Sequence, residues 1–294
     1  MTRRALLLLG RGRYEDPWHD YAATAQRVAA VLAGQGVQPE LRSLFPDALA
    51  GARPGGEDQP AASRADQPTE GAADGERVGV GDRPTERVGV GDRPTERVGV
   101  GDRPTERTAE TPPGEDHPWD LVVVLAGRGR TDPGFDGDDD AWVPFHDQLA
   151  ALVAGGTALL GIHAAANTFA DHPGWPELLG GRWVPGTSMH PPIGPAIFRP
   201  TGRDHPVTRG LPPVETYDER YCRLVVAPTS EVLLTTEHDG VSHPVVWAAS
   251  PAGADRPGLG RVLYDGLGHD VRSYDSPTRR ELLAREVAWL LRRA

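Results

Sequence analysis

The stretch TALLGIHAAA at residues 157–166 decides the fold of this chain, because a strand-like apolar run leads directly into a tight turn. Residues 157–162 have the length and composition of a buried strand, and the small residues around 161–166 allow a sharp strand-to-helix turn. His163 stands at the turn position where a nucleophile elbow carries Ser or Cys. We therefore expect an α/β fold whose active centre is organised around His163 and which lacks an elbow nucleophile for acyl transfer.

Strand and helix patterns alternate on both sides of this turn. Strands are predicted at 4–9, 39–44, 119–125, 157–162, 196–199, 231–236, 244–249 and 260–264. Helices are predicted at 21–32, 138–153 and 277–291. Continuous apolar strands separated by helices indicate a mostly parallel sheet covered by helices on both faces, with extra strands in the C-terminal half.

A repeat interrupts this pattern. The decapeptide VGVGDRPTER occurs three times in succession, at 78–87, 88–97 and 98–107. It lies in a stretch from about 52 to 117 that is rich in Gly, Pro, Glu, Asp and Arg and has almost no large apolar residues. Such a segment cannot bury enough apolar surface to offset the entropy lost on ordering. We interpret 52–117 as a disordered insertion in a single domain that spans 1–294.

Composition excludes several classes of function. The net charge of −11 argues against nucleic acid or an anionic membrane as a partner, since both require a basic surface. No stretch approaches the length of a membrane span, and the apolar run near the N-terminus is too short for a signal-peptide core. Cys222 is the sole cysteine, so no intrachain disulfide can form, and we expect a cytoplasmic protein.

Polar residues follow several of the predicted strands. His163 ends one strand, while glycine-containing loops at 10–13 and 127–130 follow two others. Doubly wound sheets bind their ligands beyond the carboxyl ends of the strands. A neutral imidazole at a helix start suits a general base or a metal ligand. A histidine that is hydrogen-bonded inside the core would give the same pattern, and that alternative stays open at this stage.

Two further segments in the C-terminal half carry candidate residues. The acidic pair in YDERY at 217–221 fits either the wall of a binding site or a solvated turn. The segment GLGHD at 266–270 places His269 after a predicted strand. Both segments lie far along the chain from His163, so only the fold can bring them together.

Taken together, these segments resemble the ThuA-like (trehalose utilisation) family. The similarity runs in order through WHD at 18–20, GIHAA at 161–165, Phe169 with Trp175, Gly180-Gly181, His190, His205-Pro206 with Gly210-Leu211, DERY at 218–221, PVVW at 244–247, and GRV at 260–262 leading to LGH at 267–269. Arg220 departs from the family pattern, which more often has an apolar residue there.

The resemblance implies a flavodoxin-like domain of the class I glutamine amidotransferase type that has lost the glutaminase cysteine. It also implies a carbohydrate-catabolic enzyme, a hydrolase or lyase, acting on a sugar derivative such as a 3-keto-disaccharide. The competing hypothesis is a non-catalytic sugar-binding or structural module of the same fold. A small carbohydrate is the expected partner in either case, and homo-oligomerisation stays open.

For the enzyme, we assign catalytic roles to His163, Glu219 and His269. The residues expected to bind substrate are His19, His190, Arg11, Arg128 and Asp218. A variant of this hypothesis makes His163, His190, Glu219 and His269 ligands of a divalent metal such as zinc, because neutral imidazole and carboxylate suit that ion. None of these residues has the local spacing of a strong metal motif such as HExxH.

Overall fold

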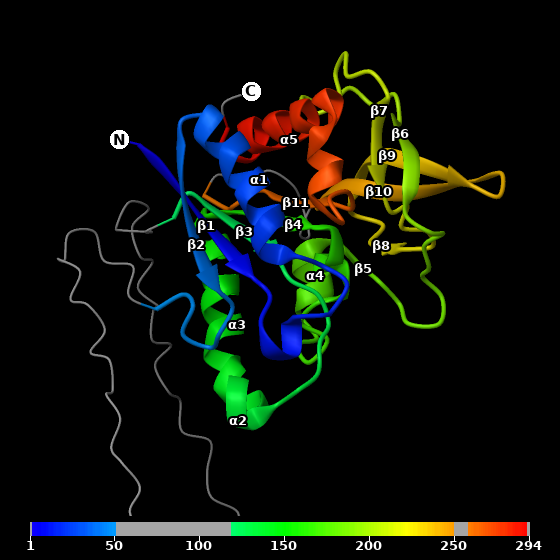
Figure 1. The fold of residues 1–294 in the computed structure, drawn as a ribbon. Coiled ribbons are helices and arrows are strands. Elements are labelled where there is room, and N and C mark those ends of the chain that lie inside the picture. Colours follow the sequence, from blue (N-terminus) through cyan, green and yellow to red (C-terminus); the bar gives the residue numbers. More distant parts are fainter. Residues whose placement is uncertain (1, 51–118, 250–257, 293–294) are drawn as a thin grey trace, which may run out of the picture. The chain divides into compact units, whose positions relative to one another are not determined.

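The strand that ends before His163 lies in the middle of a large sheet. A computed structural model describes residues 2–50, 119–249 and 258–292. Among these residues, nine strands form one sheet in the order β2-β1-β3-β4-β11-β10-β9-β6-β7 (Figure 1). All described residues belong to one compact unit. The insertion predicted at about 52–117, with its repeats, lies outside the described residues.

One half of the sheet is parallel. Its strands are β2 (Val37–Ser43), β1 (Arg3–Leu9), β3 (Leu121–Leu125), β4 (Ala158–Ile162) and β11 (Val262–Asp265). Strands β3 and β4 are buried along their whole length, which explains why they appear in the sequence as uninterrupted apolar runs. The order 2-1-3-4 followed by a fifth parallel strand is the flavodoxin-like order. This confirms the predicted fold class.

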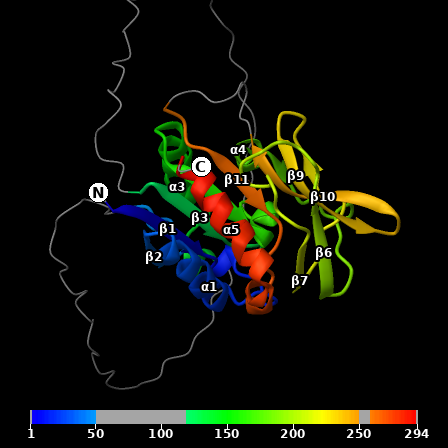
Figure 2. The same cartoon turned by 90° about the horizontal axis from the view of Figure 1, so that it is seen from above.

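Helices cover both faces of the parallel half. They are α1 (Tyr21–Gly34) and α5 (Pro277–Leu290) on one face, and α3 (Asp139–Ala154) and α4 (Trp175–Leu179) on the other. Leu7 and Val123 share a core with α1 and α5, whereas the adjacent Leu6 and Val122 share a core with α3 and α4. Neighbouring residues of a strand point to opposite faces, so each strand contributes to both cores. Figure 2 shows the sheet between α1 and α3.

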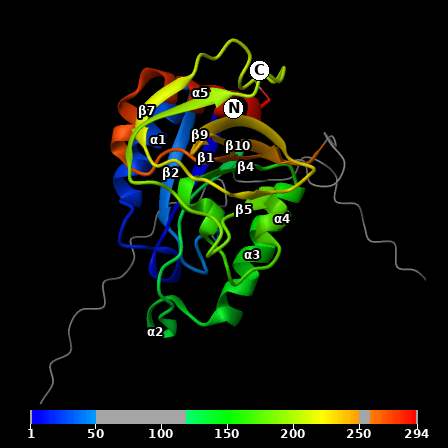
Figure 3. The ribbon, with the colours of Figure 1, turned by 90° about the vertical axis from the view of Figure 1, so that its right-hand side faces the viewer.

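The other half of the sheet is antiparallel. It continues from β11 through β10 (Val241–Ala249), β9 (Glu231–His238), β6 (Gly194–Pro200) and β7 (Val214–Asp218). A separate small sheet pairs β5 (Gly181–Arg182) with β8 (Val225–Val226). Figure 3 shows the antiparallel strands from their side of the molecule. Strand β7 has no counterpart among the predicted strands, and it ends at the acidic candidate Asp218, directly before Glu219.

Most predicted elements are present with ends shifted by one to three residues, such as the helix predicted at 21–32 and observed as α1. Two short helices were not predicted: α4, and α2 (Pro133–Asp136). The turn after β4 forms a 3₁₀ helix at His163–Asn167. No helix among the described residues is long and apolar enough to cross a membrane.

Candidate active site

His163 occupies the turn directly after β4, with its backbone in the left-handed region at a φ of 47°. This conformation is uncommon for a residue other than glycine and often marks a functional position. A Cβ atom on Gly161, near the end of β4, would lie 2.7 Å from Cδ1 of Leu179, so a larger residue there would push that side chain aside. Nδ1 of the buried His163 ring lies 2.9 Å from the carbonyl oxygen of Gly266. A carbonyl oxygen can only accept, so Nδ1 carries a proton, and in the neutral ring Nε2 has a free lone pair.

Glu219 follows β7 and extends its carboxylate toward His163. Its Oε2 atom lies 3.4 Å from Nε2 of His163 and 3.3 Å from Nδ1 of His269. The other oxygen, Oε1, lies 3.3 Å from Nδ1 of His190. Burial alone would raise the pKa of Glu219, but the interactions with His163 and His269 outweigh burial and hold the pKa well below its usual range. Glu219 is therefore ionised at neutral pH.

Asp218, the last residue of β7, holds the loop that carries His269. Its carboxylate accepts hydrogen bonds from the backbone N–H groups of Gly268 (2.8 Å) and His269 (3.0 Å) and from the hydroxyl of Ser273 (2.6 Å). Gly268 has a φ of 107°, which favours glycine at this turn. We expected Asp218 to bind substrate. Its side chain is instead buried and occupied, so it positions His269.

The pKa of His269 differs from that of an exposed histidine. Burial alone would lower this pKa, but the nearby carboxylates, Glu219 first among them, raise it overall. The ring therefore binds a proton more readily than an exposed imidazole does, as long as Glu219 faces it.

His19 enters the site from the segment between β1 and α1. Its Nδ1 atom lies 2.6 Å from Oδ1 of Asp16, and Oδ2 of Asp16 accepts a hydrogen bond from the hydroxyl of Tyr21 at 2.7 Å. Burial lowers the pKa of His19 more than Asp16 raises it. The ring is neutral at neutral pH, with its proton on Nδ1 and a lone pair on Nε2.

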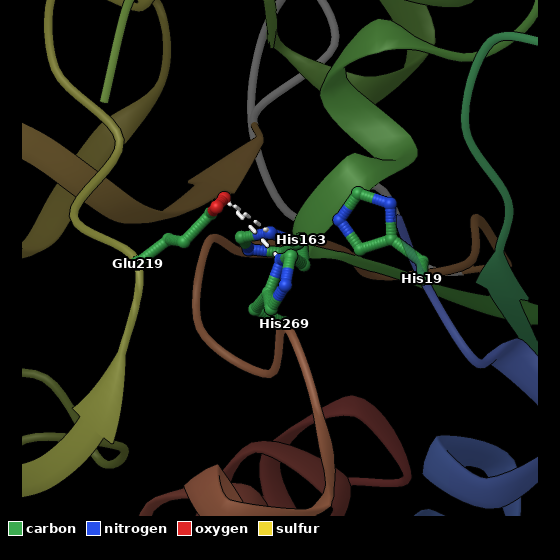
Figure 4. Close-up of side chains that lie close together, drawn as sticks. All are labelled: His19, His163, Glu219 and His269. Carbon is green, nitrogen blue, oxygen red and sulfur yellow. Dashed lines mark ion pairs between the residues drawn. The ribbon is translucent and has the colours of Figure 1, made fainter. Parts of the chain in front are cut away.

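These four side chains form one cluster, which comprises His19, His163, Glu219 and His269. One nitrogen or oxygen atom from each lies within 4.8 Å of the corresponding atoms of the other three. Figure 4 shows His19 and Glu219 on opposite sides of His163 and His269. Among the described residues, Nε2 of His19, Nε2 of His163 and Nδ1 of His269 are buried without a hydrogen-bond partner. The cluster can hold a cation or exchange protons with a bound molecule.

The structure brings the three residues predicted as catalytic into contact. His19, predicted to bind substrate, is the fourth member of the cluster. His190 lies outside the group of four, because its exposed ring approaches Glu219 from the solvent side. The predicted metal set of His163, His190, Glu219 and His269 therefore needs one replacement on geometric grounds, with His19 taking the place of His190.

A cavity of about 570 Å³ adjoins the cluster on the side of His19. Its lining includes Arg11, which pairs with Glu15 at 2.9 Å, and Trp18, whose side chain is 74% exposed. Arg11 thus lines the same cavity as His19, and its role in binding substrate stays a prediction. Arg128 is exposed in the loop after β3 and is not among the residues that line this cavity.

Three groups that orient the cluster were not predicted from the sequence: the carboxylate of Asp16, the hydroxyl of Tyr21 and the carbonyl of Gly266. Asp16 could have been found from its spacing, because it precedes His19 by three residues in a loop that follows a strand. The Gly266 carbonyl belongs to the backbone and leaves no side-chain signal in the sequence.

The ThuA family model, described as trehalose utilisation, matches residues 120–290. No curated protein matches the sequence.

Solved structures share the fold at low sequence identity. A ThuA-like protein from Parabacteroides merdae is 14% identical, with a TM-score of 0.59 over 99% of this chain and 90% of that one. A ThuA-like protein from Bacteroides uniformis is 15% identical, with a TM-score of 0.57 over 98% and 91%. A cytoplasmic protein from Salmonella typhimurium is 10% identical, with a TM-score of 0.52 over 98% of both chains.

Proposed function

This chain belongs to the trehalose utilisation (ThuA) family, and from that membership we propose that it is a carbohydrate-catabolic enzyme whose reaction takes place at the cluster of His19, His163, Glu219 and His269. One observation carries the proposal: four side chains from distant segments converge, three of their ring nitrogens are buried without a hydrogen bond, and one of the four, His19, lines a cavity. A purely structural domain gains nothing from such an arrangement, because each buried unpaired nitrogen destabilises the fold.

The substrate we propose is a 3-keto derivative of a disaccharide. The ketone at C3 acidifies the proton on C2, so a base can remove that proton and leave an enolate. The electron pair then forms the C1–C2 double bond, the C3 carbonyl is restored, and the bond from C1 to the leaving oxygen breaks. A proton donor completes the departing alcohol. Addition of water across C1 and C2 converts this elimination into a net hydrolysis.

Such a reaction needs a base, a proton donor and a group that stabilises the enolate oxygen. It does not need the pair of carboxylic groups that ordinary glycosidases use. The cluster supplies neutral imidazole from His19 and a carboxylate from Glu219 that stays ionised. His190 adds an exposed imidazole at the solvent side of Glu219.

Glutaminase activity is not expected. The elbow position carries His163, and Cys222 is buried with its thiol donating to the carbonyl of Arg220 at 3.3 Å. Burial also raises the pKa of the Cys222 thiol, which disfavours the reactive thiolate.

The test is to incubate the purified full-length chain with 3-ketotrehalose and, in parallel, with trehalose. We expect release of free glucose, and transient absorbance of the enone, from the keto sugar alone. The variant His163→Ala should abolish release, whereas Cys222→Ala, a matched change at a buried residue outside the cluster, should retain it. Binding of the keto sugar without any turnover would favour the alternative of a non-catalytic sugar-binding module. Turnover that survives His163→Ala would show that the reaction takes place elsewhere.

A further inference from the structure

We propose that His19, His163, Glu219 and His269 bind one divalent transition-metal ion of the zinc class. This inference rests on the cluster used in the proposed function and adds a cofactor to it. Four ligand atoms within 4.8 Å of one another, drawn from the segments that follow β1, β4, β7 and β11, are the starting observation.

The donor set selects the class of ion. Three imidazole nitrogens and one carboxylate oxygen suit zinc and its neighbours in the first transition row. Magnesium and calcium prefer sites built from oxygen ligands and water, and this cluster offers only one carboxylate. The proposal is therefore a zinc-type centre.

The hydrogen bonds around the cluster prepare the rings as ligands. Histidines that bind a metal usually donate their second N–H to a carboxylate or a backbone carbonyl. His19 donates from Nδ1 to Asp16 at 2.6 Å, and His163 donates from Nδ1 to the carbonyl of Gly266 at 2.9 Å. In both rings this leaves the lone pair on Nε2, and both of these Nε2 atoms are buried without a partner.

The spacing within the cluster fits one shared ion. Two ligand atoms that each lie about 2.1 Å from a tetrahedral ion are roughly 3.4 Å apart. Oε2 of Glu219 lies 3.4 Å from Nε2 of His163 and 3.3 Å from Nδ1 of His269. The widest separation allowed within the cluster, 4.8 Å, exceeds this tetrahedral spacing, so binding one ion requires the outermost ligand atoms to move closer together by up to about 1.4 Å.

A network of plain ion pairs explains the cluster less well. A protonated imidazole that pairs with a carboxylate makes a hydrogen bond of about 2.7–2.9 Å. The observed separations from Glu219 are longer, and neither Nε2 of His163 nor Nδ1 of His269 makes a hydrogen bond within the described residues. The centre of the His19 ring also lies 5.1 Å from that of His163 and 4.6 Å from that of His269, so several protonated rings would repel one another.

The ion would supply what the proposed elimination most needs. A divalent cation stabilises a developing enolate oxygen as a Lewis acid. If His163 and His269 bind the ion, neither ring is free to accept the C2 proton. His190 also lies beside Glu219 but is outside the four ligands. We therefore assign to His190 the transfer of the C2 proton.

The test measures metal binding without any sugar. The full-length chain, purified without a histidine tag, is stripped with a chelator, and binding of Zn²⁺ is followed by calorimetry. Co²⁺ serves as a second probe, because its visible absorption reports coordination. We expect one ion per chain. His19→Ala and the conservative Glu219→Gln should weaken Zn²⁺ binding by more than the roughly 10–100-fold typical of losing an outer partner. His238→Ala is the matched control, because that ring also faces a carboxylate, Asp239 at 3.5 Å, but lies outside the cluster.

Two results would overturn the metal site: a folded wild-type chain that binds neither ion, or affinities in both cluster variants equal to that of His238→Ala. Circular dichroism of each variant separates lost ligands from lost folding, and Glu219→Gln keeps the size of the side chain. The proposed function fails independently, because a chain that binds zinc but turns over no keto sugar keeps the site and loses the activity. If a chain that binds no metal turns over the keto sugar, the proposed activity stands and the proposed metal site is wrong.

Discussion

Asp16 holds His19 through a contact of 2.6 Å between Oδ1 and Nδ1, and the same carboxylate organises the surrounding segment. It also accepts hydrogen bonds from the backbone N–H of Trp18 at 3.0 Å and from the hydroxyl of Tyr21 at 2.7 Å. One buried carboxylate thus fixes both the tautomer of a cluster histidine and the path of the chain beside the cavity.

Replacing Asp16 should weaken the metal site without removing a ligand. Asp16→Asn removes the charge that holds His19 in its tautomer, and we expect Zn²⁺ affinity to fall about 10–100-fold, as for other outer partners of metal ligands. Calorimetric titration measures the change. Asp20→Asn is the matched control, because it removes a nearby charge while Asn still caps α1. Equal affinities in the two variants would contradict the role given to Asp16.

Replacing Asp218 should loosen the loop that carries His269. In Asp218→Asn an NH2 group, which cannot accept a hydrogen bond, replaces one of the two carboxylate oxygens. Both oxygens accept hydrogen bonds in the wild type, so at least one buried donor loses its partner. We expect a loss of about 1–3 kcal/mol in the free energy of unfolding, measured with urea. Glu215→Gln changes an exposed carboxylate of the same strand and should stay within about 0.5 kcal/mol of wild type. A similar small effect for both variants would show that Asp218 does not hold the loop.

His190 should be separable from the metal ligands. We expect His190→Asn to retain one zinc ion per chain, because the ring approaches Glu219 from outside the group of four. The kcat on a 3-keto-disaccharide should fall about 10²–10⁴-fold, the usual contribution of a general acid or base. Metal analysis and steady-state kinetics on the same preparation check both parts. Loss of zinc in this variant would return His190 to the ligand set.

Trp18 should contribute to binding of the sugar. Its side chain is 74% exposed and lines the cavity beside His19, where an aromatic face can stack on a sugar ring. Trp18→Ala should raise KM several-fold with little change in kcat, and should alter stability by less than about 0.5 kcal/mol because the residue is exposed. Phe135→Ala removes another exposed aromatic ring, 58% exposed in α2, and should leave KM unchanged. An unchanged KM in the Trp18 variant would rule out this role.

A second buried network should determine part of the stability at acidic pH. Burial alone would raise the pKa of Asp171, but the interaction with His146, 3.9 Å away, and the hydrogen bond from Tyr14 outweigh burial and lower the pKa from 3.8 to about 2. Because this pKa is lower in the folded than in the unfolded chain, the carboxylate stabilises the fold above pH 3.8, and the stabilisation is lost as pH falls toward 2.

Asp171→Asn should therefore lower the free energy of unfolding most near neutral pH. Its difference from wild type should shrink as pH falls from 3.8 toward 2. Urea unfolding at a series of pH values measures it. Asp140→Asn, an exposed change in α3, controls for a general effect of charge. A difference that stays constant from neutral pH down to pH 2 would contradict the argument.

The sequence was sufficient for the parallel half of the fold, because β3 and β4 are buried on both faces and therefore appear as continuous apolar runs. Strand β7 was missed, because only its two ends are buried and its composition resembles a polar loop. Within the cluster, His163 could be predicted from its local turn. The partnership with His19 could not, because it depends on how the loop after β1 crosses the sheet edge and on the unpredicted strand that brings Glu219 back.

The four cluster residues come from segments that are distant in the sequence, and this has a consequence for the unfolded chain. A ligand that joins such segments holds together the ends of long loops in the chain. The conformational entropy that the chain loses on closing a loop grows only slowly with the length of that loop. An ion held at the cluster would act as a cross-link between the first loop of the sheet and its last, and its binding energy would be folding energy. Such a cross-link would directly join two segments that follow strands of the sheet, residues 10–20 and 266–270.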